Sequence, residues 1–260
     1  MVLPVKRARK RVDLFSSLPP GSILDFPAGG GEESSQLVRM GYQAFAADLF
    51  LPKPKPRGVF YVQADANRVF PFREESFDYV LSREGIEHLE YQAEFIRECA
   101  RVLKPSGKLV ITTRNVLHLY GRLSYMLSGQ RILGRGFINE IQTPRFLGNA
   151  RAYHGHAFLI DYFRLRYLLR LSGFDRIEVF TDRYSSSSIA LAWMVPLMRA
   201  IFALSVRGSI RKDLRKGKHH AYGSVFKELK AHVFSPALLF GKRMIVMATK
   251  MPSQIPADVG

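Results

Sequence analysis

Cysteine is almost absent from this 260-residue chain, in which Cys99 is the single one. One cysteine excludes a disulfide framework and any zinc site built from several cysteines, and it fits a reducing compartment. The basic residues 6–11 are not followed by an apolar stretch, so the pattern of a secretory signal is also missing. These absences predict a cytoplasmic protein.

Acidic residues are scarce in the second half of the chain. Residues 1–114 carry 17 Lys and Arg against 14 Asp and Glu, a net charge of +3, whereas residues 115–260 carry 22 against 8, a net charge of +14. The excess therefore belongs to one part of the chain. Such a field favours anionic partners: phosphate groups, nucleic acid or an anionic membrane surface.

Strand patterns alternate with helical patterns through the first half of the chain. The strand patterns lie at residues 22–26, 43–48, 60–64, 76–82 and 108–113, and the helical ones at 32–40 and 90–103. A further helix at 159–171 and strands at 176–181 and 244–249 would complete the fold. We predict an α/β fold, Rossmann-like and doubly wound, with a mostly parallel seven-stranded sheet, helices on both faces and two insertions on the substrate side.

The expected organisation follows from where the alternation is interrupted. We expect a basic N-terminal segment (1–17), a nucleoside-binding core (18–115), a first insertion or lid (116–156), a core helix and strand (157–183), a second insertion made of an apolar helix and a basic run (184–239), a final core strand (240–250) and a tail (251–260).

Ligands of such sheets bind outside the carboxyl ends of the strands. The first predicted strand ends at Asp25 and leads into residues 27–31, Pro-Ala-Gly-Gly-Gly, where missing side chains allow a ligand to lie against the backbone. A dinucleotide-binding G-x-G-x-x-G would need a glycine in place of Ser34, and the acidic helix start would repel a pyrophosphate. A cationic nucleoside fits better, with Asp48 at its ribose and Asp65 at its purine amino group.

Residues 24–31, Leu-Asp-Phe-Pro-Ala-Gly-Gly-Gly, resemble the nucleoside loop L-D-x-G-C-G-x-G of class I S-adenosylmethionine (SAM) dependent methyltransferases. Residues 70–82, 84–89 and 100–109 resemble later motifs of that family, in the expected order. Pro27 departs from the pattern, because it replaces the first glycine and has no amide donor. The resemblance implies SAM as cofactor, bound by Asp25, Ala28, Gly29, Gly31, Asp48, Asp65, Ala66, Ser82 and Arg83.

Methyl transfer from a sulfonium is an in-line displacement, so the protein mainly positions donor and acceptor. An oxygen or nitrogen acceptor can also need a base. The candidates are His88, after the fourth predicted strand, and His154 and His156, near the end of the first insertion.

Glu84, Glu87 and His88 form E-x-x-E-H, which resembles the metal-binding triad of ubiquinone-pathway O-methyltransferases. Carboxylates with one imidazole suit a divalent cation. SAM enzymes that use no metal also carry E-H-L, however, and we expect no metal here.

The acceptor is less constrained by the sequence. The sequence lacks the Asn/Asp-Pro-Pro-aromatic motif of amino-base methyltransferases. Residues 115–123, 156–173 and 234–250 loosely resemble bacterial methyltransferases of surface-polysaccharide and lipid-linked sugar pathways. We predict methylation, at oxygen rather than nitrogen, of a small or lipid-linked acceptor. The alternatives are an RNA methyltransferase and a non-catalytic Rossmann-like module that binds RNA or a membrane.

Residues 189–206 are apolar except for Pro196, Arg199 and Ser205, and a cationic run continues to Lys218. A central arginine costs about 2.5–3.5 kcal/mol at the bilayer centre, which disfavours a spanning helix. A lid helix and an interfacial anchor remain open. In the anchored case the protein would lie in the cytoplasm with peripheral contact to the inner face of the membrane through residues 189–218.

Overall fold

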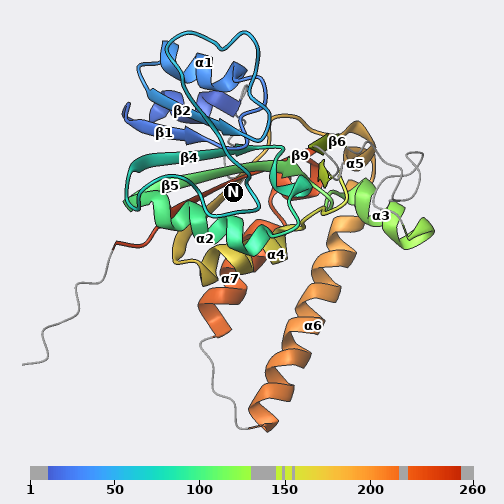
Figure 1. Cartoon of the computed structure of the whole chain (residues 1–260). Coiled ribbons are helices and arrows are strands. Elements are labelled where there is room, and N and C mark those ends of the chain that lie inside the picture. Colours follow the sequence, from blue (N-terminus) through green and yellow to red (C-terminus); the bar gives the residue numbers. More distant parts are fainter. Residues whose placement is uncertain (1–10, 130–144, 148–149, 154–155, 217–221, 253–260) are drawn as a thin grey trace, which may run out of the picture.

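The computed structural model describes residues 11–129, 145–147, 150–153, 156–216 and 222–252. Its main feature is a seven-stranded sheet (Figure 1) in the order β3-β2-β1-β4-β5-β9-β8. The strands are β1 (Ser22–Asp25), β2 (Gln43–Asp48), β3 (Phe60–Gln63), β4 (Phe77–Arg83), β5 (Leu103–Arg114), β8 (Phe174–Phe180) and β9 (Arg243–Lys250). Strands β1 to β5 pair in parallel, and β9 is antiparallel to both of its neighbours, β5 and β8. The predicted Rossmann-like fold is confirmed.

Two separate apolar clusters hold helices on the two faces of the sheet. On one face Phe15, from η1 (Arg11–Ser17), and Leu37, from α1 (Glu32–Arg39), pack with Tyr79 and Val110 of the strands. On the other face α2 (Gln92–Val102) and α4 (Tyr162–Leu171) bury apolar side chains in a larger cluster, which includes Cys99. Burial in that cluster raises the pKa of the Cys99 thiol well above its usual range, which disfavours the thiolate that a nucleophilic role would need.

The helical boundaries follow local capping chemistry. The pattern predicts a helix from residue 159, but α4 begins three residues later because the Asp161 carboxylate accepts hydrogen bonds from the amides of Phe163 (2.8 Å) and Arg164 (3.1 Å). An aspartate in this position satisfies amides that have no partner inside the helix.

The remaining elements lie between β5 and β9 in the sequence. They are α3 (Leu119–Ser128), the short strands β6 (Arg145–Leu147) and β7 (Ala150–Tyr153), α5 (Ser186–Ala190), η3 (Ala192–Met194), α6 (Val195–Arg215), α7 (Tyr222–Val233) and α8 (Pro236–Phe240). The apolar segment 189–206 is thus divided among α5, η3 and α6, and Pro196 stands in the first turn of α6, where it costs no helical hydrogen bond. Figure 1 shows α6 projecting away from the sheet.

Candidate active site

A pocket of about 270 Å³ opens where the carboxyl ends of β1, β2 and β4 meet the loop after β3. Six of the nine residues predicted to bind the nucleoside line it: Ala28, Gly29, Asp48, Asp65, Ala66 and Arg83. Asp48 and Asp65 therefore face one cleft, although 17 positions separate them in the sequence. This convergence is what a parallel sheet produces when successive strands end at the same edge.

The glycine loop between β1 and α1 forms one wall of the pocket. Gly29 has a φ of 55°, and a side chain built there would meet nothing within 4 Å, so the space above this residue is open. Gly31 has a φ of 77° and lies against the Tyr61 hydroxyl, where a Cβ would overlap the phenol oxygen. Pro27 and Gly85 both line the pocket and lie against each other, so that a Cβ at Gly85 would overlap the proline ring. Both close approaches require glycine.

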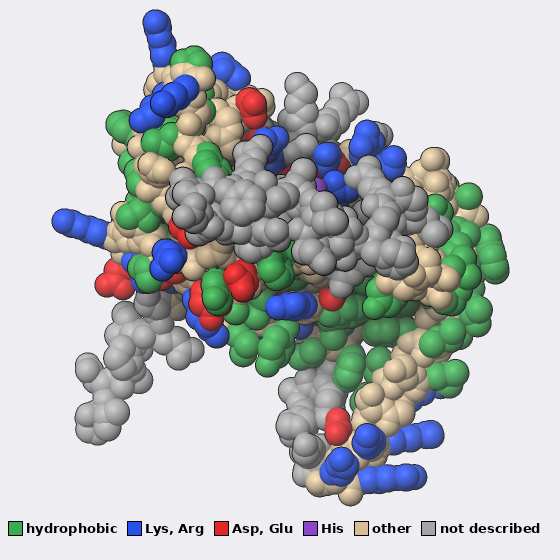
Figure 2. Space-filling view, turned by 45° about the vertical axis from the view of Figure 1, so that its right-hand side comes forward, with side chains coloured by type: hydrophobic (Ala, Val, Ile, Leu, Met, Phe, Trp, Pro, Cys, Tyr) green, Lys and Arg blue, Asp and Glu red, His purple; other side chains and the backbone are tan. Residues whose placement is uncertain are grey.

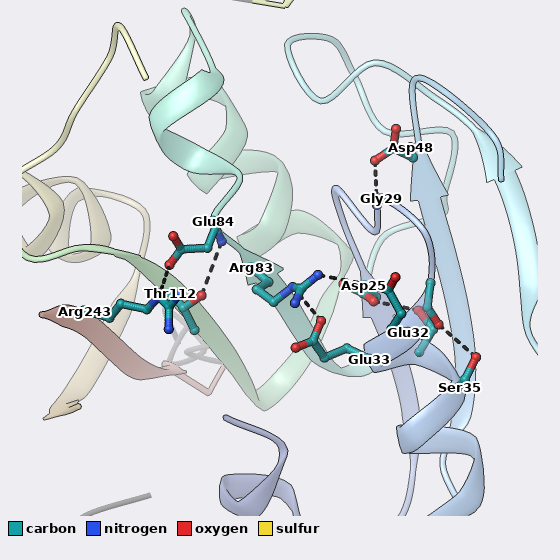
Figure 3. Close-up of polar contacts among 12 residues, drawn as sticks. Asp25, Gly29, Glu32, Glu33, Ser35, Asp48, Arg83, Glu84, Thr112 and Arg243 are labelled. Atoms are coloured by element: carbon teal, nitrogen blue, oxygen red, sulfur yellow. Dashed lines mark hydrogen bonds and ion pairs between the residues drawn. The ribbon is translucent and has the colours of Figure 1, made fainter. Parts of the chain in front are cut away.

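Asp48 connects the glycine loop to the end of β2 (Figure 3). One carboxylate oxygen accepts a hydrogen bond from the amide of Gly29 (2.8 Å), and the other accepts one from the amide of Phe50 (2.9 Å). Each oxygen of a carboxylate can accept two hydrogen bonds, so capacity for a pair of ribose hydroxyls remains.

The loop after β3 is fixed by a residue that the sequence reasoning missed. Asn67 lines the pocket, and its side-chain oxygen accepts hydrogen bonds from the amides of Glu90 (3.0 Å) and Tyr91 (3.2 Å) at the start of α2. Asp65 accepts a hydrogen bond from the Asn67 amide (2.9 Å). An aspartate followed two residues later by asparagine in a strand-end turn was the available signal.

Asp25, Gly31 and Ser82, three of the predicted binding residues, do not line the pocket. Asp25 is buried behind the glycine loop, where its carboxyl accepts a hydrogen bond from the Ser34 hydroxyl (2.6 Å). Burial raises the pKa of Asp25 to about 7, and the Ser34 hydrogen bond partly opposes that shift. Asp25 supports the loop instead of facing the pocket.

Arg83 lines the pocket, but its charge is already paired. Its guanidinium contacts the carboxylates of Glu33 (2.5 Å) and Glu32 (3.5 Å) at the start of α1, as Figure 3 shows. The ion pairs tie β4 to α1. One guanidinium offsets only one of the two carboxylates, so the start of α1 keeps a net negative charge, which disfavours a pyrophosphate. The Arg83 side chain is therefore a brace between two walls of the pocket.

One of the candidate bases lines the pocket, and a second lies beside it. His88 ends η2 (Ile86–His88) and lines the pocket, and its ring is 4.7 Å from that of His156, centroid to centroid. His154 lies outside the described residues. The structure thus brings together two of the three predicted histidines, from segments 68 positions apart.

The E-x-x-E-H triad is not assembled as the sequence suggested. Glu84 has a φ of 46°, and its carboxylate pairs with the Arg243 guanidinium (3.3 Å) on β9. In its place, His156 joins Glu87 and His88, and one ligand atom from each of these three lies within 4.8 Å of the others. The backbone of Glu84 is left-handed, and its side chain pairs with Arg243 on β9 instead of joining Glu87 and His88.

Glu87 is the buried member of this group. Its carboxyl accepts a hydrogen bond from the Thr113 hydroxyl (2.8 Å), and within the described residues its second oxygen has no hydrogen-bond partner. Burial raises the pKa of Glu87 to about 7, with the Glu84 carboxylate adding to the shift. A carboxyl of this kind can orient a neighbouring imidazole or hold a proton.

Residues 24–111 match the family model described as "Methyltransferase domain". The chain carries a methyltransferase domain of the class I SAM-dependent family. The predictions of that family and of SAM as the cofactor are confirmed.

Relatives with curated names extend the similarity. The chain is 37% identical over 109 residues to demethylmenaquinone methyltransferase of Corynebacterium urealyticum (41% of this chain, 46% of the relative). It is 27% identical over 187 residues to the ubiquinone/menaquinone biosynthesis C-methyltransferase UbiE of Pseudomonas fluorescens (65% of this chain, 71% of the relative). It is 32% identical over 103 residues to ubiquinone biosynthesis O-methyltransferase of Caulobacter vibrioides (36% and 41%). The chain spans less than half the length of the first and third relatives.

Among solved structures, a SAM-dependent methyltransferase from Archaeoglobus fulgidus superposes with a TM-score of 0.53 at 15% identity, over 93% of this chain and 92% of that one. This likeness shows the fold. The names of these relatives give no support to a sugar or polysaccharide acceptor, and they do not favour an RNA methyltransferase or a non-catalytic module.

Proposed function

We propose that this protein transfers the methyl group of SAM to a small-molecule acceptor that reaches the pocket from the side of His88 and His156. The observation that carries the proposal is the meeting of three strand-end features at one pocket: the open backbone at Gly29, the Asp48 carboxylate and the Asp65–Ala66 turn. SAM supplies an electrophilic methyl on a sulfonium. The chain must bind it, exclude water and align the acceptor.

The pocket offers suitable chemistry for each part of SAM. Asp48 has accepting capacity for the two ribose hydroxyls, and the Asp65–Ala66 turn can meet the purine beside the apolar side chains of Leu49 and Leu89. Gly29 leaves room for the methionine portion, while Asp25 and Ser34 support that loop from behind.

A proton must leave an oxygen or nitrogen acceptor during the transfer, and the imidazoles of His88 and His156 are the candidate bases. Glu87 is buried, precedes His88 in the sequence and lies close to both histidines in space, so it is a candidate to hold the pair in position. We favour oxygen over nitrogen as the methylated atom, and a small or lipid-linked molecule as the acceptor. We expect the reaction to need no metal; a divalent cation bound by Glu87, His88 and His156 would add a requirement that dialysis against a chelator reveals.

The test of SAM binding is calorimetric titration with SAM and with its demethylated product. The wild-type chain should bind both, and Asp48→Ala should weaken binding by about a hundredfold or more, because two hydroxyl contacts to a charged group are lost, each about 1.5 kcal/mol or more. Asp175→Ala, on the edge strand β8, is the matched control and should bind as the wild type does. No binding at millimolar SAM would refute the proposal and favour a non-catalytic module.

The acceptor is tested separately. Incubation with methyl-labelled SAM and quinone-type phenols, with RNA as a comparison, should label a phenol and leave RNA unlabelled. Labelled RNA would refute the small-molecule assignment while leaving SAM binding intact.

A further inference from the structure

We propose that the outer face of α6 docks the protein on an anionic lipid surface. The proposal concerns a surface away from the SAM pocket: among the described residues, no pocket-lining side chain belongs to α6. It therefore goes beyond the methyl transfer proposed above, and neither proposal depends on the other.

The inner face of α6 is already used for packing. Val195, Met198 and Phe202 recur at helical spacing and pack against a small cluster built around Leu119, Val233 and Phe234. Arg199 turns its guanidinium toward the body of the protein as well, and lies 5.4 Å from the centroid of the Phe234 ring. One face of α6 is therefore enough to attach the helix to the rest of the protein.

The outer face of the same helix stretch is apolar and exposed. Leu197, Ile201 and Leu204 are 60%, 58% and 66% exposed, and Trp193 in the preceding turn is 73% exposed. At 100° per residue these three α6 side chains fall within one stripe about 60° wide, whose centre lies about 125° around the helix from that of the inner face. Because Arg199 is turned toward Phe234, the central arginine does not interrupt this stripe.

Cations continue the stripe toward the end of the helix. Arg207, Arg211 and Arg215 follow Leu204 at spacings that keep them on the outer side, and all three are exposed. Figure 2 shows hydrophobic side chains along α6 near the body and lysine and arginine side chains gathered at its far end. One face therefore presents first apolar and then cationic side chains.

This arrangement of side chains indicates which kind of partner the outer face of α6 binds. A lipid surface provides an apolar layer beneath anionic headgroups, and an apolar helix face flanked by Lys and Arg is the pattern that binds there. RNA would be contacted by cations interleaved with stacking aromatic side chains. Here the exposed stripe of α6 is aliphatic, and the exposed Trp193 lies before the start of the helix, at the end away from Arg207, Arg211 and Arg215. A second copy would bring two arginine-rich helix ends together in a chain of net charge +17.

Docking in the plane of the surface also fits better than spanning. Residues Ala192–Arg215 form a helix long and apolar enough to cross a membrane by length and composition alone, and none of its apolar window is buried in the protein. However, the inner face of α6 packs against Phe234 and its neighbours, and a spanning helix would have to separate from them.

The test is cosedimentation of the full chain with vesicles of phosphatidylcholine, with and without phosphatidylglycerol, at low and high salt. We expect binding to the phosphatidylglycerol vesicles at low salt, and weakening by about tenfold or more at high salt, because each nearby cation adds about 1 kcal/mol, or about fivefold, at an anionic surface. Equal binding to neutral vesicles, or no binding to either kind, would overturn the proposal. Binding that resists high salt and alkaline extraction would indicate a spanning helix instead.

Two matched pairs of variants separate the surface from general effects. Leu197→Ser with Ile201→Ser should reduce vesicle binding by about tenfold or more, since two aliphatic side chains that would be buried in the lipid surface are lost. Tyr167→Ser with Leu171→Ser, on α4, removes two side chains of the same spacing and similar exposure (62% and 60%) and should leave binding unchanged. An equal loss in both pairs would refute the assignment to α6.

The charged part is tested in the same way. Arg207→Gln, Arg211→Gln and Arg215→Gln together should abolish the difference between anionic and neutral vesicles. Arg39→Gln, Arg97→Gln and Arg164→Gln, which remove the same charge from exposed positions of α1, α2 and α4, should preserve it. The urea-unfolding transition of every variant checks folding independently of SAM binding. Vesicle binding lost together with a cooperative unfolding transition would show misfolding, and the Leu197→Gln variant, which shortens the apolar stripe without adding a charge, then decides the question: it should reduce vesicle binding while the unfolding transition stays normal.

Discussion

The buried carboxyl group of Asp25 gives the folded protein a pH dependence that an amide in its place should remove. Asp25 ends β1 beneath the glycine loop, and its nearest polar partner is the Ser34 hydroxyl, 2.6 Å away. Burial is the largest influence on this group and raises its pKa to about 7. The folded state therefore binds a proton that the unfolded chain releases at lower pH.

The sign and size follow from that difference. Below about pH 4 the carboxyl is protonated in both states and contributes no pH dependence. Between about pH 4 and pH 7 the unfolded chain loses the proton while the folded chain keeps it, so the free energy of unfolding falls as the pH rises. At 1.36 kcal/mol per pKa unit the loss approaches about 4 kcal/mol near neutrality, and above that pH it stays constant.

Asp25→Asn keeps an oxygen that can accept the Ser34 hydrogen bond and carries no charge at any pH. Urea unfolding at a series of pH values should show the variant gaining stability relative to the wild type from about pH 4 to pH 7, by about 4 kcal/mol in total. Ser34→Ala should act in the opposite direction, because that hydrogen bond lowers the Asp25 pKa and its loss enlarges the penalty. Asp175→Asn is the control for removing a carboxylate. The reasoning is refuted if Asp25→Asn follows the wild-type pH profile.

Three further predictions concern the loop that supports the site, a candidate base and the packing of the chain after β5 against α8. Gly31→Ala should destabilise the fold by about 1–3 kcal/mol and weaken SAM binding, since its φ of 77° disfavours a side chain and its Cβ would overlap the Tyr61 hydroxyl; Tyr61→Phe in the same chain should restore part of the stability, measured by urea unfolding. His156→Gln should lower kcat by about 10²–10⁴-fold at unchanged SAM affinity, and an unaltered kcat in single-turnover assays would exclude it as a base. Asn115→Ala should cost about 3 kcal/mol, seen as a lower Tm, because the buried amide donates to the carbonyls of Leu238 (2.9 Å) and Gly241 (2.8 Å); an unchanged Tm would contradict this.

The residues of the proposed cofactor half of the site could be predicted because they lie at strand ends. The pattern of apolar residues along the sequence shows where each strand ends. Asp48 ends β2 and Asp65 follows β3, and a parallel sheet brings both to one edge regardless of the side chains between them. Asp25 shows the limit of that reasoning. A strand end determines which edge a residue reaches, but whether its side chain faces the ligand or the core depends on the course of the following loop.

The acceptor half could not be predicted in the same way, because it depends on contacts between distant segments. A local spacing proposed Glu84, Glu87 and His88 as one group, yet Glu84 pairs with Arg243, which lies 159 positions later. His156 joins the group from a segment in which the sequence shows no sustained periodicity. No short-range sequence pattern predicts the contact of Glu84 with Arg243 or that of His156 with His88, because the two residues of each pair come from different elements of the fold.

The composition of the apolar segment 189–206 fits several roles, and only its position in the structure distinguishes among them. A lid should place side chains over the pocket, but the described lining of the pocket contains none from α6, and the helix projects away from the sheet in Figure 1. An ordinary core helix should bury one apolar stripe and expose a polar one. Here Met198 and Phe202 pack inward while Leu197, Ile201 and Leu204 remain exposed on a separate side of the helix. A second apolar stripe adds nothing to the stability of the isolated chain and favours association, so a partner surface is the simplest physical reason for its presence.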